Sequence, residues 1–84
     1  MEVELSSTAK RELRRLDKPV ARRILSRLLW LAENMNAITP TPLKGEWAGF
    51  FKLRVGDYRV LYEIIEEEPL IFVLRIGHRR EIYR

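Results

Sequence analysis

Residues 52–62 read KLRVGDYRVLY, and their apolar and polar side chains alternate on both sides of Gly56 and Asp57. Alternation with a period of two is typical of β-strands, and a glycine beside an aspartate between two such runs is typical of a tight hairpin turn. We therefore expect a β-hairpin built from strands over residues 50–55 and 58–65.

The expected register brings three cations together on one face of the hairpin. If Val55 pairs with Tyr58, Arg54 lies directly opposite Arg59, and Lys52 is two residues away on the same face. Two unit charges about 5 Å apart repel by roughly 3 kcal/mol at an effective dielectric constant near 20. A carboxylate, solvation of arginines that spread apart, or an anionic ligand can relieve this repulsion. Because paired arginines suit phosphate oxygens, one interpretation is a phosphate cradle, and the other is a solvated cluster without a ligand.

The rest of the chain predicts a single α+β domain over residues 1–84. Apolar residues at helical spacing indicate two helices, and Asp17 can cap the second, with Pro19 tolerated in its first turn. An N-terminal strand, two helices and then three strands predict a helical hairpin packed on one face of a mainly antiparallel sheet of three or four strands. The expected elements follow the order βααβββ: strand 1–6, helices 8–16 and 18–35, an extended loop 36–47, and strands 50–55, 58–65 and 70–76.

Alternation also assigns the two faces of the last predicted strand, 70–76. Every second residue should face the helices, while the others should join the cationic face. The core-facing set is then Leu70, Phe72, Leu74 and Ile76, and the cationic face gains Ile71, Val73 and Arg75.

Composition excludes several classes of function. Sixteen lysines and arginines against 12 acidic residues give a net charge of +4, which is compatible with an RNA or DNA partner. There are no cysteines and one histidine, so we expect neither a metal nor another cofactor. No apolar run approaches a membrane span and no signal-peptide core is present, so we expect a cytoplasmic protein. The predicted helices carry basic residues that are either solvated or in contact with phosphate: Lys10, Arg11, Arg14, Arg15, Arg22, Arg23 and Arg27.

The last nine residues, IGHRREIYR, add candidate functional groups. His78, Arg79 and Arg80 follow the last predicted strand, and Tyr83 lies near the end of the chain. If this segment returns along the sheet, it reaches the same end as Arg54 and Arg59. A phosphate clamp, a proton donor and an aromatic platform for a base together form a plausible set for cleaving RNA without a metal.

The runs PLKGEWAGFFKLRVGDYRVLYEI (42–64) and LRIGHRREIYR (74–84) resemble the RelE/ParE superfamily of toxins from type II toxin–antitoxin systems. The resemblance implies a compact toxin that a small acidic antitoxin wraps and inhibits, and that reaches operator DNA only through the antitoxin complex. RelE members act under stress in the A site of the small (30S) ribosomal subunit and cut mRNA there. The ribose 2′-OH attacks the adjacent phosphate and leaves a 2′,3′-cyclic phosphate and a 5′-OH.

The resemblance also implies roles for individual residues. Lys52 matches a lysine proposed as base or charge stabiliser, and Arg59 matches the phosphate-binding arginine. Arg79 matches an arginine proposed as acid or leaving-group stabiliser, and Tyr83 matches a tyrosine that stacks on the nucleotide. An arginine is a poor proton donor, so His78 is the better acid on chemical grounds. The remaining RNA- and phosphate-binding candidates are Arg54, His78 and Arg80.

The sequence departs from the family at Phe50, where well-known RelE proteins have the first of two lysines spaced two residues apart. Lys52 must then act alone, or another group must be the base. Three functions remain open: a ribosome-dependent mRNA endoribonuclease, a ParE-like toxin that binds DNA gyrase and cuts no RNA, and a degenerate corepressor that only binds its antitoxin. The retained Lys52, Arg59, Arg79 and Tyr83 favour the endoribonuclease.

Overall fold

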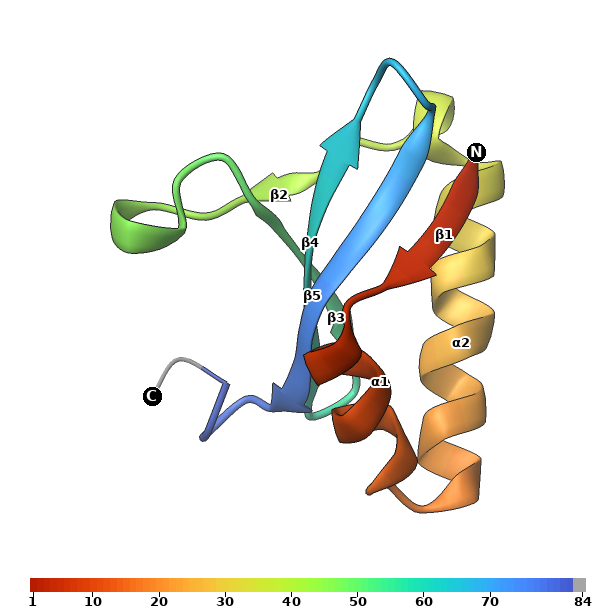
Figure 1. Ribbon diagram of the computed structural model, residues 1–84, viewed down its shortest axis with the longest axis vertical. Coiled ribbons are helices and arrows are strands. Elements are labelled where there is room, and N and C mark those ends of the chain that lie inside the picture. Colours follow the sequence, from red (N-terminus) through yellow and green to blue (C-terminus); the bar gives the residue numbers. More distant parts are fainter. Residues whose placement is uncertain (83–84) are drawn as a thin grey trace.

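The computed structural model describes residues 1–82 and shows a twisted five-stranded sheet with two helices (Figure 1). The strands lie in the order β1-β5-β4-β3-β2, in which β1 is parallel to β5 and the other pairs are antiparallel. The predicted α+β class is confirmed, and the sheet gains a short edge strand inside the expected loop. The elements are β1 (Glu2–Leu5), α1 (Ser7–Arg14), α2 (Lys18–Glu33), η1 (Met35–Ala37), β2 (Thr41–Pro42), η2 (Gly45–Trp47), β3 (Phe51–Val55), β4 (Tyr58–Ile65) and β5 (Leu70–His78).

The two helices begin differently. Ser6 caps α1, since its Oγ accepts a hydrogen bond from the Ala9 N–H at 3.0 Å. Asp17 occupies the predicted cap position of α2, but its side chain makes no capping hydrogen bond, and Pro19 lies in the first turn. Apolar side chains of both helices and of the sheet form one core between them. Within the described residues, no helix combines the length and apolar character needed to cross a membrane.

The β3–β4 hairpin has the predicted register. Val55 pairs with Tyr58 and Arg54 pairs with Arg59. Gly56 has φ +59°, in the left-handed region that a glycine adopts without strain. The close opposition of two arginines is therefore a real feature of the fold.

The predicted faces of β5 are wrong over most of the strand because β4 and β5 pair through a β-bulge. Leu61 pairs with Arg75 while Tyr62 pairs with Val73, so Leu74 is an extra residue. One extra residue reverses the alternation beyond it. Ile71 and Val73 consequently face the helices and are fully buried. Ile76 was predicted correctly, whereas the core cluster does not include Leu70, Phe72 or Leu74.

Helix α1 covers the part of β5 that β1 leaves unpaired. Ser6 Oγ donates to the Leu74 carbonyl at 2.9 Å, and a Glu12 carboxylate oxygen accepts from the Ile76 N–H at 2.9 Å. Glu12 also pairs with Arg75, at 3.1 Å to Nη2. Arg75 was predicted to be part of the cationic face, but Glu12 neutralises it at the edge of the sheet.

Candidate functional site

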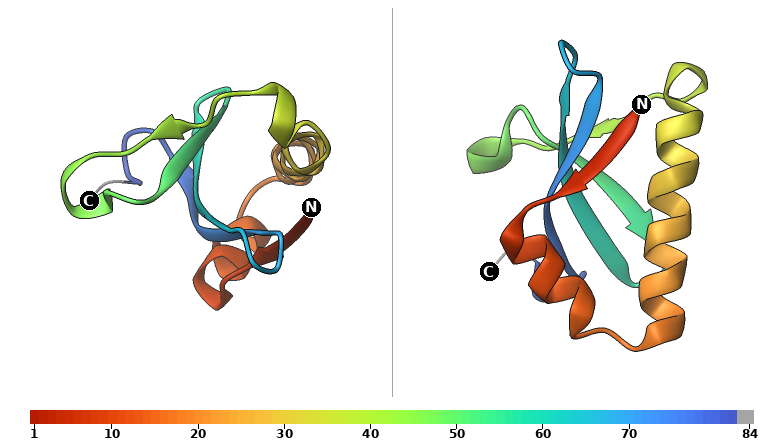
Figure 2. Two further views of the ribbon diagram at one scale, coloured as in Figure 1. Left: turned by 90° about the horizontal axis from the view of Figure 1, so that it is seen from above. Right: turned by 45° about the vertical axis from the view of Figure 1, so that its right-hand side comes forward.

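The face of the sheet opposite α2, called the outer face here, carries Lys52, Arg54 and Arg59. Arg59 lies between Arg54 on β3 and Gly77 on β5, and Lys52 lies in the next row, opposite Leu61. The loop 43–50 and the C-terminal segment 79–82 both project on this side of the sheet, away from α2 (Figures 1 and 2). The outer face is therefore flanked by two irregular segments, as a binding surface often is.

Arg59 is held in place by the hairpin turn. Its Nη1 donates to the carbonyl oxygens of Gly56 at 3.0 Å and Tyr58 at 2.9 Å. Two carbonyl dipoles thus offset part of the repulsion from Arg54, which we did not predict. The Nε and Nη2 groups make no hydrogen bond within residues 1–82. This free edge of the guanidinium is the one that can bind two oxygens of a phosphate.

The other outer-face cations lack carboxylate partners in the described part of the chain. The ion pairs within residues 1–82 join Arg75 to Glu12 and Arg79 to Asp57, and neither Lys52 nor Arg54 takes part in one. Glu63, a carboxylate on β4, forms no ion pair with Lys52 within residues 1–82. The positive charge of the outer face is therefore available to an anion.

The C-terminal segment brings Arg79 to the same end of the sheet, as predicted. The Arg79 N–H donates to the Asp57 carbonyl at 2.8 Å, and Arg79 Nε lies 3.8 Å from Asp57 Oδ1. Both side chains are at least half exposed, so the backbone bond fixes the position more firmly than the ion pair does. Tyr83, the candidate stacking residue, lies outside the described residues.

His78 lies on the other face of the sheet from Lys52 and Arg59. It pairs with Tyr58, and the two rings meet edge to face at 5.5 Å on the side of the helices. Its Nδ1 accepts a hydrogen bond from the Arg80 N–H at 3.2 Å, while the Arg80 side chain is exposed. The structure therefore does not bring His78 together with the predicted phosphate cradle.

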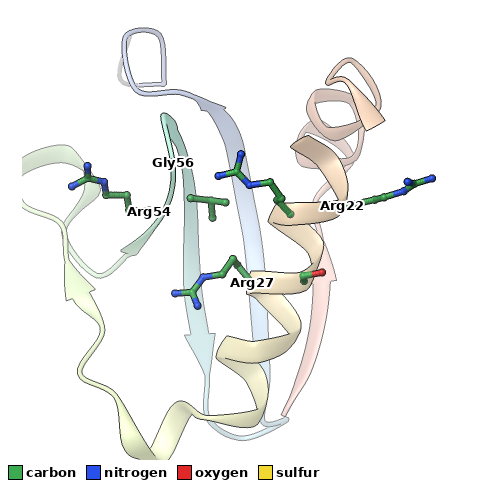
Figure 3. A pocket seen from close by; sticks show the side chains of 7 residues that line it. Arg22, Arg27, Arg54 and Gly56 are labelled. Atoms are coloured by element: carbon green, nitrogen blue, oxygen red, sulfur yellow. The ribbon is translucent and has the colours of Figure 1, made fainter. Parts of the chain in front are cut away.

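A second cationic feature, which we did not predict as a site, lies between α2 and the end of β3 (Figure 3). Four arginines, Arg22, Arg23, Arg27 and Arg54, line a hollow of about 460 Å³, and no acidic residue lines it. Arg27 extends from α2 toward β3, whereas Arg22 points to the other side of the helix. We call this feature the arginine groove. Basic residues of α2 signalled it in the sequence, but only the fold shows that Arg54, whose side chain extends away from α2 in Figure 3, borders the same hollow.

The arginine groove continues along β3 toward Lys52, which lines its second part. A second hollow shares Arg27 and Arg54 and is also lined by Trp30, Leu53 and Tyr62. Arg27 lies over the Trp30 ring at 4.5 Å. Burial raises the pKa of the Tyr62 phenol above its usual value of 10.0, so this group stays protonated at neutral pH. Tyr62 is 1% exposed and belongs to the core cluster, so its role is in packing.

Known proteins resemble this chain over nearly its whole length. A family model described as "ParE toxin of type II toxin-antitoxin system, parDE" matches residues 3–83. Toxin RelG of Mycobacterium tuberculosis is 37% identical, with 98% of this chain and 94% of the relative covered. Toxin RelE of the same organism is 29% identical, with 98% and 84% covered.

Solved structures show the same fold. The RelBE2 toxin–antitoxin complex of M. tuberculosis superimposes with a TM-score of 0.82 at 32% identity, covering 93% of this chain and 96% of the other. The isolated RelE toxin of E. coli has a TM-score of 0.76 at 24% identity, with 92% and 82% covered. The resemblance seen in the sequence is confirmed: the chain belongs to the RelE/ParE family of toxins from type II toxin–antitoxin systems.

Proposed function

We propose that this toxin is a ribosome-dependent mRNA endoribonuclease that cuts mRNA in the A site and so inhibits translation. The observation that carries the proposal is the outer face, where Lys52 and the free guanidinium edge of Arg59 lie without a carboxylate partner in residues 1–82 and Arg79 is tied beside them. Clustered, unneutralised cations suit a substrate phosphate. A toxin that binds gyrase or only its antitoxin has no need of this arrangement.

The proposed reaction needs no metal. A bond forms between the ribose 2′-oxygen and phosphorus, and the bond from phosphorus to the 5′-oxygen breaks. The proton of the 2′-OH passes to a base, and the 5′-oxygen takes up a proton from water, while negative charge grows on the phosphate oxygens. Protein groups must therefore accept one proton and stabilise charge at two places.

We assign these roles from the described geometry together with the family resemblance, and the role of Tyr83 rests on the resemblance alone. Lys52 is the base or a charge stabiliser, and Arg59 holds the phosphate oxygens through its Nε and Nη2. Arg79 stabilises the leaving 5′-oxygen, and Tyr83 stacks on a base. Because His78 lies on the helix side of the sheet, we leave it out of the proton transfers. We assign Arg54 and Arg80, both exposed, to neighbouring phosphates of the RNA.

Primer extension on mRNA after induction of the toxin tests this function. We expect stops within codons positioned in the A site, with a 2′,3′-cyclic phosphate on the upstream fragment, and no cleavage of the same mRNA without ribosomes. Intact transcripts together with gyrase-linked DNA breaks would instead establish the ParE-like activity. Intact transcripts and intact DNA would leave the corepressor function.

We further propose that a small acidic antitoxin is the inhibitory partner and that it binds in the arginine groove. The structurally similar M. tuberculosis protein was solved as a toxin–antitoxin complex. Arginines without acidic neighbours offer charge complementarity to carboxylates, and Trp30, which is 40% exposed, offers apolar surface that a protein segment can cover. The same groove contains Arg54, so bound antitoxin would also shield one end of the outer face.

Neutralising the groove should weaken antitoxin binding. We expect the double variant Arg23→Gln/Arg27→Gln to lose about 10-fold or more in affinity, since two charge-assisted contacts are removed. The matched control is Lys10→Gln/Arg11→Gln, which removes the same charge from the exposed surface of α1. Calorimetric titration with the antitoxin measures both. An equal loss in the two variants would show that net charge, not the groove, sets the affinity.

A further inference from the structure

The C-terminal segment 79–82 ends in one buried side chain. Arg79, Arg80 and Glu81 are exposed, whereas Ile82 is 1% exposed. Ile82 does not belong to the core cluster that joins the helices to the sheet. It is therefore buried at a separate place, and the packing of the main core does not require it.

That place is Gly77, on the outer face of β5. Gly77 pairs with Arg59, and Leu61, one row further along the same face, is also fully buried although it lies outside the main core. A Cβ atom at Gly77 would come within 3.0 Å of Ile82 Cδ1 and 3.7 Å of Ile82 Cβ. Gly77 is not among the glycines with positive φ, so its backbone accepts any residue. A side chain at Gly77 would therefore crowd Ile82, whose Cδ1 would have to shift by a few tenths of an ångström.

Backbone hydrogen bonds also fix the C-terminal segment 79–82. The N–H groups of Glu81 and Ile82 both donate to the His78 carbonyl, at 2.9 and 3.0 Å, and the Arg79 N–H donates to Asp57 at 2.8 Å. The turn therefore has one end on the hairpin and the other on Gly77. Arg79 is held between two fixed points, and Tyr83 follows Ile82 directly in the sequence.

We propose that Ile82 seated on Gly77 is a latch, a pair of positioning residues that holds the C-terminal segment against the outer face. The latch contributes no chemical group to the reaction. It fixes the backbone that carries Arg79, so that Arg79 can act at the leaving 5′-oxygen of the phosphate held by Arg59. The effect on activity rests on the proposed function, whereas the latch itself is a property of the fold.

Hydrogen exchange tests the latch without any assay of activity. In Gly77→Ala and in Ile82→Ala, the amides of Arg79, Glu81 and Ile82 (or the residue replacing it) should lose protection about 10-fold or more, while amides within the β3–β4 hairpin keep theirs. A double-mutant cycle sharpens the result: adding Ile82→Ala to Gly77→Ala should cause little further loss, since Ile82 is already displaced. Unchanged protection of these amides in Gly77→Ala would overturn the latch.

Single-turnover cleavage of mRNA on the ribosome tests its purpose. With toxin at saturation, Gly77→Ala and Ile82→Ala should slow cleavage about 10-fold or more, because a misplacement near 1 Å is costly in a preorganised site. Binding to the ribosome should not change, and Ile82→Val should keep most of the rate. Leu29→Ala, which trims a 60% exposed side chain on α2, is the control and should cleave normally.

The two measurements separate failure of the latch from failure of the proposed function. Lost protection with an unchanged cleavage rate would show that the position of the segment does not matter for catalysis. The catalytic purpose of the latch would then be refuted, while the endoribonuclease function would stand. A wild-type protein that leaves mRNA intact on the ribosome would refute the proposed function and, with it, the catalytic purpose of the latch. The exchange data would then decide the latch as a structural feature alone.

Discussion

Replacing Arg59 with alanine should slow mRNA cleavage on the ribosome about 100- to 1000-fold, the usual cost of removing a preorganised donor to a developing negative charge. The turn carbonyls of Gly56 and Tyr58 hold Nη1 and so aim the Nε–Nη2 edge outward. No reorganisation is then needed when charge builds up on the phosphate. Single-turnover cleavage with saturating toxin measures the effect. Arg59→Lys should also be slow, since lysine keeps the charge but cannot form bidentate hydrogen bonds with the phosphate.

The matched control for Arg59 is Arg14→Ala, which removes an exposed arginine from the last turn of α1. This variant should cleave at nearly the normal rate. Both variants should bind antitoxin and should melt within a few degrees of the wild type. A normal rate in Arg59→Ala would show that the phosphate lies elsewhere. An equal loss in Arg14→Ala would mean that the total positive charge, through steering toward the ribosome, produces the effect.

The hairpin was predictable because its determinants are local. A turn at Gly56-Asp57 fixes which residues oppose each other, and alternation then sorts β3 and β4 into two faces. The opposition of Arg54 and Arg59 follows from these two facts alone. The position of Arg79 near this turn was predictable for the same reason, because a short segment after β5 cannot travel far from the strand end.

The features that were not predicted depend on contacts between distant parts of the chain. The bulge at Leu74 shifts the faces of β5, and nothing in the almost entirely apolar run LIFVLRI marks it. Glu12 forms an ion pair with Arg75, 63 residues later in the sequence, and so neutralises the charge that Arg75 was expected to add to the outer face. His78 was grouped with the tail that follows it, but pairing with Tyr58 turns its ring toward the helices. In each case contacts between distant parts of the chain set where the side chain points, and the local sequence pattern contains no sign of those contacts.

Phe50 is the residue that sets this chain apart from relatives with two lysines. It stands directly before β3, its ring meets that of Trp47 edge-on at 5.6 Å, and its carbonyl accepts a hydrogen bond from the Leu43 N–H at 3.0 Å. An aromatic pair thus closes the base of the loop 43–50 where a second cation would otherwise lie. Because residues two apart on a strand share a face, Lys52 is left as the single amine on this side of the phosphate site.

Replacing Lys52 with methionine should therefore lower the single-turnover rate about 100-fold or more, the range expected for a general base or an essential charge. Lys52→Arg separates the two roles. If Lys52 stabilises charge, arginine should restore most of the rate. If Lys52 is the base, arginine should fail, because its guanidinium does not lose a proton in proteins.

Two further variants complete the test of Lys52. Lys44→Met removes an exposed lysine from the neighbouring loop and should leave the rate unchanged. Phe50→Lys in the Lys52→Met background places an amine where relatives have one, and should recover part of the rate if an amine on this face is what the reaction requires. A Lys52→Met enzyme with the normal rate would remove lysine from the mechanism. The proton of the 2′-OH would then have to leave through a ribosomal group or water, with Arg59 and Arg79 as the toxin's whole contribution to the chemistry.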